Sequence, residues 1–194
     1  MNRWYKIPNP SIPRMSIIFA AGRVLCFANL VAECKILSIC NPIKKMVTQL
    51  PPTFRIQLIH KETMCLNKDA HSYKIVVAGE GNSIISAPIN SIVYTLYTEI
   101  YDSSTGHWRM ADNPLPNAKF GSDPGVWCKG LFYCITELPY AVVRFDAESV
   151  IWSELDADMP CSISTPVLAE SNGRLIMVGR VVNNLNKYRG MAVH

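Results

Sequence analysis

The apolar positions of the chain fall in short runs that stop at glycine, proline, asparagine or aspartate. Residues 73–79 and 131–135 are two such runs, rich in β-branched and aromatic side chains. Runs of about four to eight residues with this composition are typical of β-strands. No stretch keeps the 3.6-residue period of an amphipathic helix. The pattern predicts an all-β fold.

One segment recurs along the chain. Residues 101–108 and 145–152 both begin with an aromatic residue and an aspartate and end with a tryptophan, and residues 40–47 form a degenerate third copy. Aspartate and asparagine tolerate the backbone angles of tight turns, so each copy predicts a β-hairpin. The two tryptophans lie 44 positions apart. The repeat residues are Asn41, Tyr101, Asp102, Trp108, Phe145, Asp146 and Trp152.

Single glycines precede apolar runs at a similar spacing. Gly22, Gly130 and Gly173 each stand where a tight turn would lead into a strand, and the last two lie 43 positions apart. Together the two signals give four strands per unit, repeated about every 40 to 50 residues, which is the signature of propeller blades. We predict blades over about 15–52, 53–116 and 117–160, with a blade end at 1–14 and a partial blade at 161–194.

The repeat resembles that of kelch proteins, in which six residues separate an aromatic residue from a tryptophan. The usual Gly-Gly pair is reduced here to single glycines. Residues 37–42, 73–79, 99–103 and 173–179 are similar to the kelch-associated region of plant F-box proteins. The resemblance implies a partial kelch-type β-propeller that recognises a protein substrate for an F-box (SCF-type) ubiquitin ligase. The family binds its Skp-type adaptor through F-box helices, which these 194 residues lack.

The ends of the chain are expected to fall inside blades. Trp4 stands at a fourth-strand position with only three residues before it, and residues 173–182 supply at most a second strand before a polar segment. Three nearly complete blades and two partial ones are fewer than a closed ring needs. We therefore expect the chain to be part of a longer propeller.

Composition and charge exclude several classes of function. Hydrophobic residues make up 49% of the chain, and its net charge of +4 comes from scattered residues with Lys44 and Lys45 as the one adjacent basic pair. No basic stripe for nucleic acid is visible. The apolar run at 17–21 is too short to cross a membrane, and the proline-rich start is unlike a signal peptide. We expect a chain that stays inside the cell, in the cytoplasm or nucleus.

The sequence contains no motif for catalysis or metal binding. The seven cysteines are odd in number and include no C-x-x-C pair, and the four histidines lack ligand spacing. Kelch-like propellers include copper-radical oxidases, but the histidines here occupy unrelated positions of the repeat. We predict no catalytic residue, cofactor or metal, and therefore not an enzyme. A standalone propeller scaffold or a small-ligand binder remains the alternative to a ubiquitin-related module.

Strand order predicts where a partner would bind. The glycine and aspartate turns share one face, and the opposite face collects the loops at about 28–34, 80–91 and 137–140 with the blade-to-blade connections near 50–60, 110–124 and 154–165. Binding residues commonly lie on such loops. Each candidate could instead be merely solvated. The residues that we nominate are Glu33, Glu80, Asn82, Lys119, Phe120, Glu137 and Tyr140.

Overall fold

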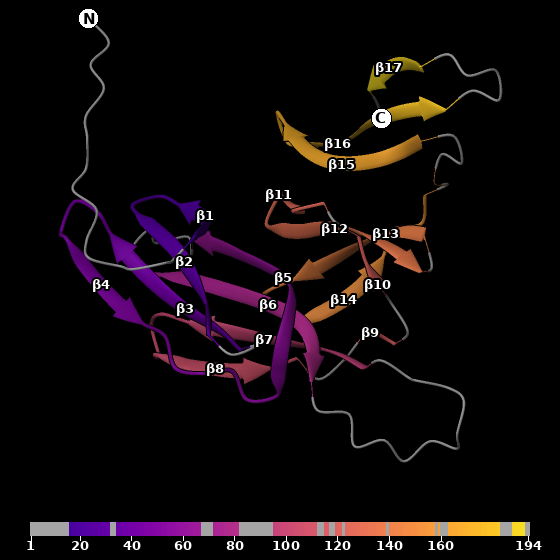
Figure 1. Cartoon of the computed structure of the whole chain (residues 1–194). Coiled ribbons are helices and arrows are strands. Elements are labelled where there is room, and N and C mark those ends of the chain that lie inside the picture. The colour runs from indigo at the N-terminus through magenta and orange to yellow at the C-terminus, as the bar shows by residue number, and fades with distance from the viewer. Residues whose placement is uncertain are drawn as a thin grey trace, which may run out of the picture.

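The computed structural model of the chain is built from antiparallel β-sheets (Figure 1). It describes residues 16–31, 34–66, 72–81, 95–111, 115–116, 119–121, 123–138, 140–157, 159, 163–182 and 188–192. Within these ranges every regular element is a strand, so the predicted all-β fold class is confirmed. The predicted blade end at 1–14, with Trp4, lies outside the described residues.

Four sheets follow one another along the chain. The first contains β1 (Ser16–Ala21), β2 (Val24–Val31), β3 (Cys34–Asn41) and β4 (Met46–Gln49). The second contains β5 (Ile56–Leu66), β6 (Tyr73–Gly81), β7 (Thr95–Asp102) and β8 (His107–Met110), and β9 (Leu115–Pro116) also pairs with β7. The third contains β12 (Leu131–Leu138), β13 (Tyr140–Asp146) and β14 (Ile151–Glu154), with β10 (Lys119–Phe120) and β11 (Val126–Cys128) both on β12. The fourth contains β15 (Ile163–Ser171), β16 (Arg174–Val182) and β17 (Tyr188–Ala192).

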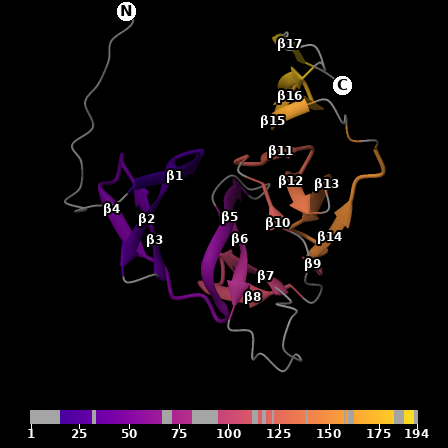
Figure 2. The same cartoon turned by 45° about the vertical axis from the view of Figure 1, so that its right-hand side comes forward.

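The sheets are arranged along an arc, each packed against the next, as blades are in a propeller (Figure 2). Strand β5 of the second sheet contacts β1 and β3 of the first, and β15 of the fourth contacts β11 and β12 of the third. Apart from β9, which pairs with β7, and β11, which pairs with β12 beside β10, the strands of each sheet neighbour one another in chain order. This meander repeated around an arc is the architecture of a β-propeller.

Strand β6 shows why the core forms between blades. Ile75 and Val77 point into the cluster shared with the first sheet, whereas Val76 and Ala78 point into the cluster shared with the third. Successive side chains of a strand face opposite sides, so a strand buried on both sides has a continuous apolar run rather than an alternating one. All four residues are at most 2% exposed.

The repeated hairpins occupy equivalent places in three sheets. Tyr101 is paired with Trp108 and Phe145 with Trp152, and the degenerate copy pairs Cys40 with Val47. Each tryptophan ring packs on its paired aromatic ring, with ring centroids 5.4 Å apart in the second sheet and 4.9 Å apart in the third.

The repeat tryptophans also join neighbouring sheets. Trp108 Nε1 donates to the carbonyl of Pro51 at 2.8 Å, and Trp152 Nε1 donates to Thr98 Oγ1 at 2.8 Å. Each indole therefore packs within its own blade and donates a hydrogen bond to the chain that precedes that blade.

The aspartate of each repeat closes its turn through its own carboxylate. Asp102 Oδ1 accepts from the hydroxyl and backbone N–H of Ser104 at 2.6 and 2.9 Å. Asp146 accepts from the backbone N–H of Glu148 at 2.8 Å and from the Ser149 hydroxyl at 2.7 Å. The amide oxygen of Asn41 accepts two backbone N–H groups in the same way. These are Asx-type turns, as the choice of Asp and Asn predicts.

These turns should make stability depend on acid pH. Hydrogen bonds from Ser104 lower the pKa of Asp102, and the Glu148 N–H lowers that of Asp146. Because the folded pKa lies below the ordinary value of about 3.9, the contribution is complete above that pH and is lost as the pH falls through the folded value. We expect the thermal midpoint to fall below about pH 4, and less steeply in the Asp102→Asn/Asp146→Asn variant, whose turns do not titrate. Equal slopes in circular dichroism melts of the two proteins would contradict this expectation.

Two expectations about strands are wrong. The chain after residue 182 does not end the sheet, because β17 pairs with β16 through partners such as Val178 and Ala192. The expected loops at 28–34 and 137–140 are largely strand: β2 and β3 extend to residues 31 and 34, and Glu137 pairs directly with Tyr140. Strand order alone predicts a connection in each place but not its length, and ladder pairing continues to Val31 and Cys34 and to Glu137 and Tyr140.

Candidate partner-binding face

The antiparallel order of the strands divides the arc into two faces. On the hairpin face lie the turns after β1, β3, β7, β11, β13 and β15. On the loop face lie the ends of β2, β6 and β12 and the described residues that link one sheet to the next. This division follows from strand direction alone.

Several polar groups of the hairpin face are hydrogen-bonded within the chain. The carbonyl of Ala147 accepts from Arg109 Nη2 at 3.1 Å and from Lys74 Nζ at 3.4 Å, which links the second sheet to the third. The turn carboxylates are hydrogen-bonded to their own turns. Two-residue turns such as Lys129-Gly130, with φ values of 49° and 82°, keep the connections on this face short. The link of residues 50–55 between the first and second sheets is longer and lies on the loop face.

Three of the nominated residues meet at the loop face of the third sheet. Lys119 Nζ forms an ion pair with Glu137 Oε2 at 3.1 Å, and Glu137 pairs with Tyr140 at the end of the β12–β13 hairpin. Tyr140 is 38% exposed. Partial burial raises the pKa of its phenol, and a phenol can both donate and accept hydrogen bonds.

Phe120 does not belong to this contact set. Its side chain is 9% exposed, and its ring centroid lies 5.7 Å from that of Trp152 in the core between the second and third sheets. A ring already packed between sheets cannot be offered to a partner without opening the core. The proposed contact role of Phe120 is therefore replaced by a packing role.

Of the other three nominated residues, only Glu80 lies within the described part of the chain. Glu80 pairs with Leu96 near the loop-face end of β6. Glu33 and Asn82 lie outside the described residues.

The sequence reasoning missed a second group on the loop face, in the link between the first and second sheets. Phe54 is 66% exposed, and the guanidinium of Arg55 lies over the ring of Tyr97 at 5.6 Å from its centroid. The sequence does contain a signal, since Phe54 and Arg55 stand close after the Pro51-Pro52 pair, with Thr53 between them. Aromatic and arginine side chains are the types enriched at binding hot spots.

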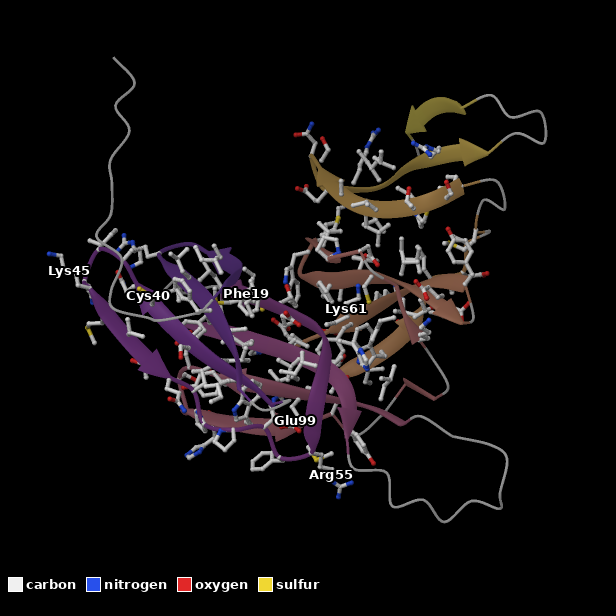
Figure 3. The ribbon with its side chains drawn as sticks, in the orientation of Figure 1. Phe19, Cys40, Lys45, Arg55, Lys61 and Glu99 are labelled. Carbon is white, nitrogen blue, oxygen red and sulfur yellow. The ribbon has the colours of Figure 1, made fainter. Side chains whose placement is uncertain are left out.

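A buried carboxylate holds this link in place. Glu99 of β7 is 0% exposed and accepts the backbone N–H groups of Phe54 and Arg55 at 2.7 Å each and of Ile56 at 3.1 Å. Thr53 Oγ1 donates to the carbonyl of Ile56 at 2.6 Å. Figure 3 shows Glu99 and Arg55 at the same end of the second sheet. The link is thus a fixed platform rather than a free loop.

The described residues offer no arrangement for metal or thiol chemistry. No three His, Cys, Asp or Glu side chains among them gather as metal ligands would. Five described cysteines are free thiols, and burial raises the pKa of Cys134, the opposite of what a reactive thiolate needs. No helix in the described ranges could span a membrane.

Two plant proteins are similar to the chain over most of its length. Protein UNUSUAL FLORAL ORGANS of Arabidopsis thaliana is 28% identical over 184 residues, which cover 92% of this chain and 40% of that protein. Protein ABERRANT PANICLE ORGANIZATION 1 of Oryza sativa subsp. indica is 28% identical over 185 residues, 88% of this chain and 41% of that protein. The chain thus spans about two fifths of the length of the curated relatives it matches.

Solved structures and a family model agree on the fold. TolB from Acinetobacter baumannii has a TM-score of 0.53 at 8% identity, over 88% of this chain and 40% of that one. An acylaminoacyl peptidase from Pyrococcus horikoshii has a TM-score of 0.52 at 10% identity, over 92% of this chain and 32% of that one. Likeness at such low identity shows the fold alone. The model described as KIB1-4 beta-propeller matches residues 1–194, and the chain belongs to the KIB1-4 β-propeller family.

Proposed function

We propose that the chain is a kelch-type, protein-binding propeller module with no catalytic role. In the complete protein, the module would hold a substrate for an F-box (SCF-type) ubiquitin ligase in the cytoplasm or nucleus. Because the chain spans only part of its relatives, this role is proposed for the longer protein. Adaptor binding is not assigned to any of these 194 residues.

The observation that supports binding is the contrast between the two faces. The hairpin face has short turns whose carboxylates are hydrogen-bonded internally, and its exposed apolar side chains, such as Ile43, are aliphatic. The loop face instead presents the exposed aromatic side chains of Tyr140 and Phe54 on well-packed strands and links. Binding residues are commonly presented in this way by a rigid scaffold. The ubiquitin context comes from the resemblance of the repeat to plant F-box/kelch proteins.

A site-specific photo-crosslinker tests the face and the role. We would place p-benzoylphenylalanine at Tyr140, which is 38% exposed on the loop face, or at Ile43, a more accessible control that is 76% exposed on the hairpin face. In cells that express the protein, crosslinks to another protein should form several-fold more often from position 140. Equal crosslinking from both positions would contradict the face assignment.

The captured protein then tests the ubiquitin role. Its ubiquitin conjugates should decrease when the gene of the complete propeller protein is deleted. Unchanged conjugation would overturn the ligase role and favour the alternative, a propeller scaffold unrelated to ubiquitin.

A further inference from the structure

Phe54 is the most exposed aromatic side chain in the described part of the chain, at 66%. Pro51 and Pro52 of the same link are also exposed, so three apolar side chains of this short segment face solvent together with Arg55. Burying an exposed Phe ring in an interface removes a large apolar area from water, and aromatic side chains dominate the energetics of interfaces. A partner that buried the Phe54 ring would therefore gain binding free energy.

The link is held at both ends before any partner binds. At its start, the carbonyl of Pro51 accepts from Trp108 Nε1 at 2.8 Å. At its end, Glu99 accepts the N–H groups of three consecutive residues. A partner that docks here does not have to order the loop, and association loses less conformational entropy as a result.

Arg55 carries a positive charge without a carboxylate partner in the described ranges. Its guanidinium lies on the Tyr97 ring, which orients the plane but leaves its N–H donors for other contacts. The nearby carboxylate of Glu99 is occupied by backbone N–H groups. A guanidinium whose N–H donors remain available is complementary to a carboxylate, which it can bind through two parallel hydrogen bonds.

We infer that Phe54 and Arg55 form a hot spot that binds a protein segment with an Asp or Glu next to an apolar side chain. The inference rests on the proposed function, because it names the partner chemistry of the same face. The apolar side chain would pack on Phe54 and the prolines, and the carboxylate would pair with Arg55. Tyr97 and Glu99 are positioning residues, the first for the guanidinium and the second for the loop.

A random 12-residue phage-displayed peptide library is the probe, sorted on the folded 194-residue chain. The wild-type chain should enrich peptides with an acidic residue beside an apolar one. Phe54→Ala should weaken their binding about tenfold or more. Arg55→Glu should reverse the charge preference, so that Lys or Arg replaces Asp or Glu in the enriched peptides.

Matched controls come from the hairpin face. Ile43→Ala removes an exposed apolar side chain, and Lys45→Glu reverses an exposed positive charge well apart from Arg55 (Figure 3). Both should bind the enriched peptides as the wild type does. Thermal midpoints equal to the wild type establish that each variant is folded, as expected for substitutions of exposed side chains.

The outcomes separate this inference from the proposed function. Acidic enrichment that survives Arg55→Glu would overturn the inference. Peptides lost with Tyr140→Ala but unaffected by Phe54→Ala and Arg55→Glu would also overturn it, while leaving the loop face as a protein-binding surface. A wild-type chain that enriches no peptide at all would count against both.

Discussion

Replacement of Glu99 by alanine should lower the free energy of unfolding by about 3–5 kcal/mol, because it leaves buried donors without an acceptor. The carboxylate is 0% exposed and accepts the N–H groups of Phe54, Arg55 and Ile56. Hydrogen bonds to a charged acceptor are about twice as strong as neutral ones. The loss should be smaller than the sum of three bonds, since the link can partly open to water once it is released.

Urea unfolding followed by tryptophan fluorescence measures this effect, with two companion variants. Glu99→Gln keeps the shape of the side chain but replaces one acceptor oxygen by a donor. Its free energy of unfolding should therefore lie between that of the wild type and that of the alanine variant. Glu154→Ala removes an exposed glutamate from β14 and should change stability by less than about 0.5 kcal/mol. If Glu99→Ala were no more destabilised than Glu154→Ala, the carboxylate would not be what holds the link.

The hairpins and blades could be predicted because their signals are local. The pairing of Tyr101 with Trp108, and of Phe145 with Trp152, is set by a turn of fixed length between them. The carboxylate of Asp102 needs only the residues that follow it to form its turn. Local chemistry of this kind repeats visibly along a sequence, and an arc of equivalent sheets follows from it.

The candidate site was harder to predict because its determinants are far apart in sequence. Glu99 binds backbone groups that lie 43 to 45 positions earlier, and nothing near it distinguishes it from a solvated glutamate. Phe120 shows the reverse case, because its sequence suggests an exposed aromatic residue but its side chain is buried. It stands in a two-residue strand of the third sheet, and its burial depends on packing against the second sheet. Only the packing of one blade on another separates an exposed aromatic from a buried one.

A buried pair of opposite charges lies between the second and third sheets. Lys61 of β5 is 5% exposed, and its Nζ lies 3.3 Å from Asp123 Oδ1, whose side chain is 1% exposed. The ammonium also donates to the carbonyl of Asp123. The carboxylate accepts further N–H groups from Gly125 at 3.0 Å and from Ile135 at 3.3 Å. Every oxygen of this carboxylate therefore has a partner.

Lys61→Met should lower the free energy of unfolding by about 3–5 kcal/mol, because it leaves a buried carboxylate without its cation. The double variant Lys61→Met/Asp123→Asn should recover part of that loss. Its neutral amide no longer needs a counter-charge, although it cannot accept from both Gly125 and Ile135 as the carboxylate does. A residual loss of about 1–2 kcal/mol is expected from that mismatch.

Urea unfolding of the single and double variants decides whether the charge or the packing matters. The exposed pair of Lys119 and Glu137 supplies the control: Lys119→Met breaks an ion pair whose side chains are 68% and 47% exposed, and should cost at most about 1 kcal/mol. A double variant as unstable as Lys61→Met alone would show that lost packing, not an uncompensated charge, is responsible. Recovery in the double variant would instead identify the ion pair as the contact that fixes the second sheet against the third, because its two residues lie 62 positions apart on adjacent blades.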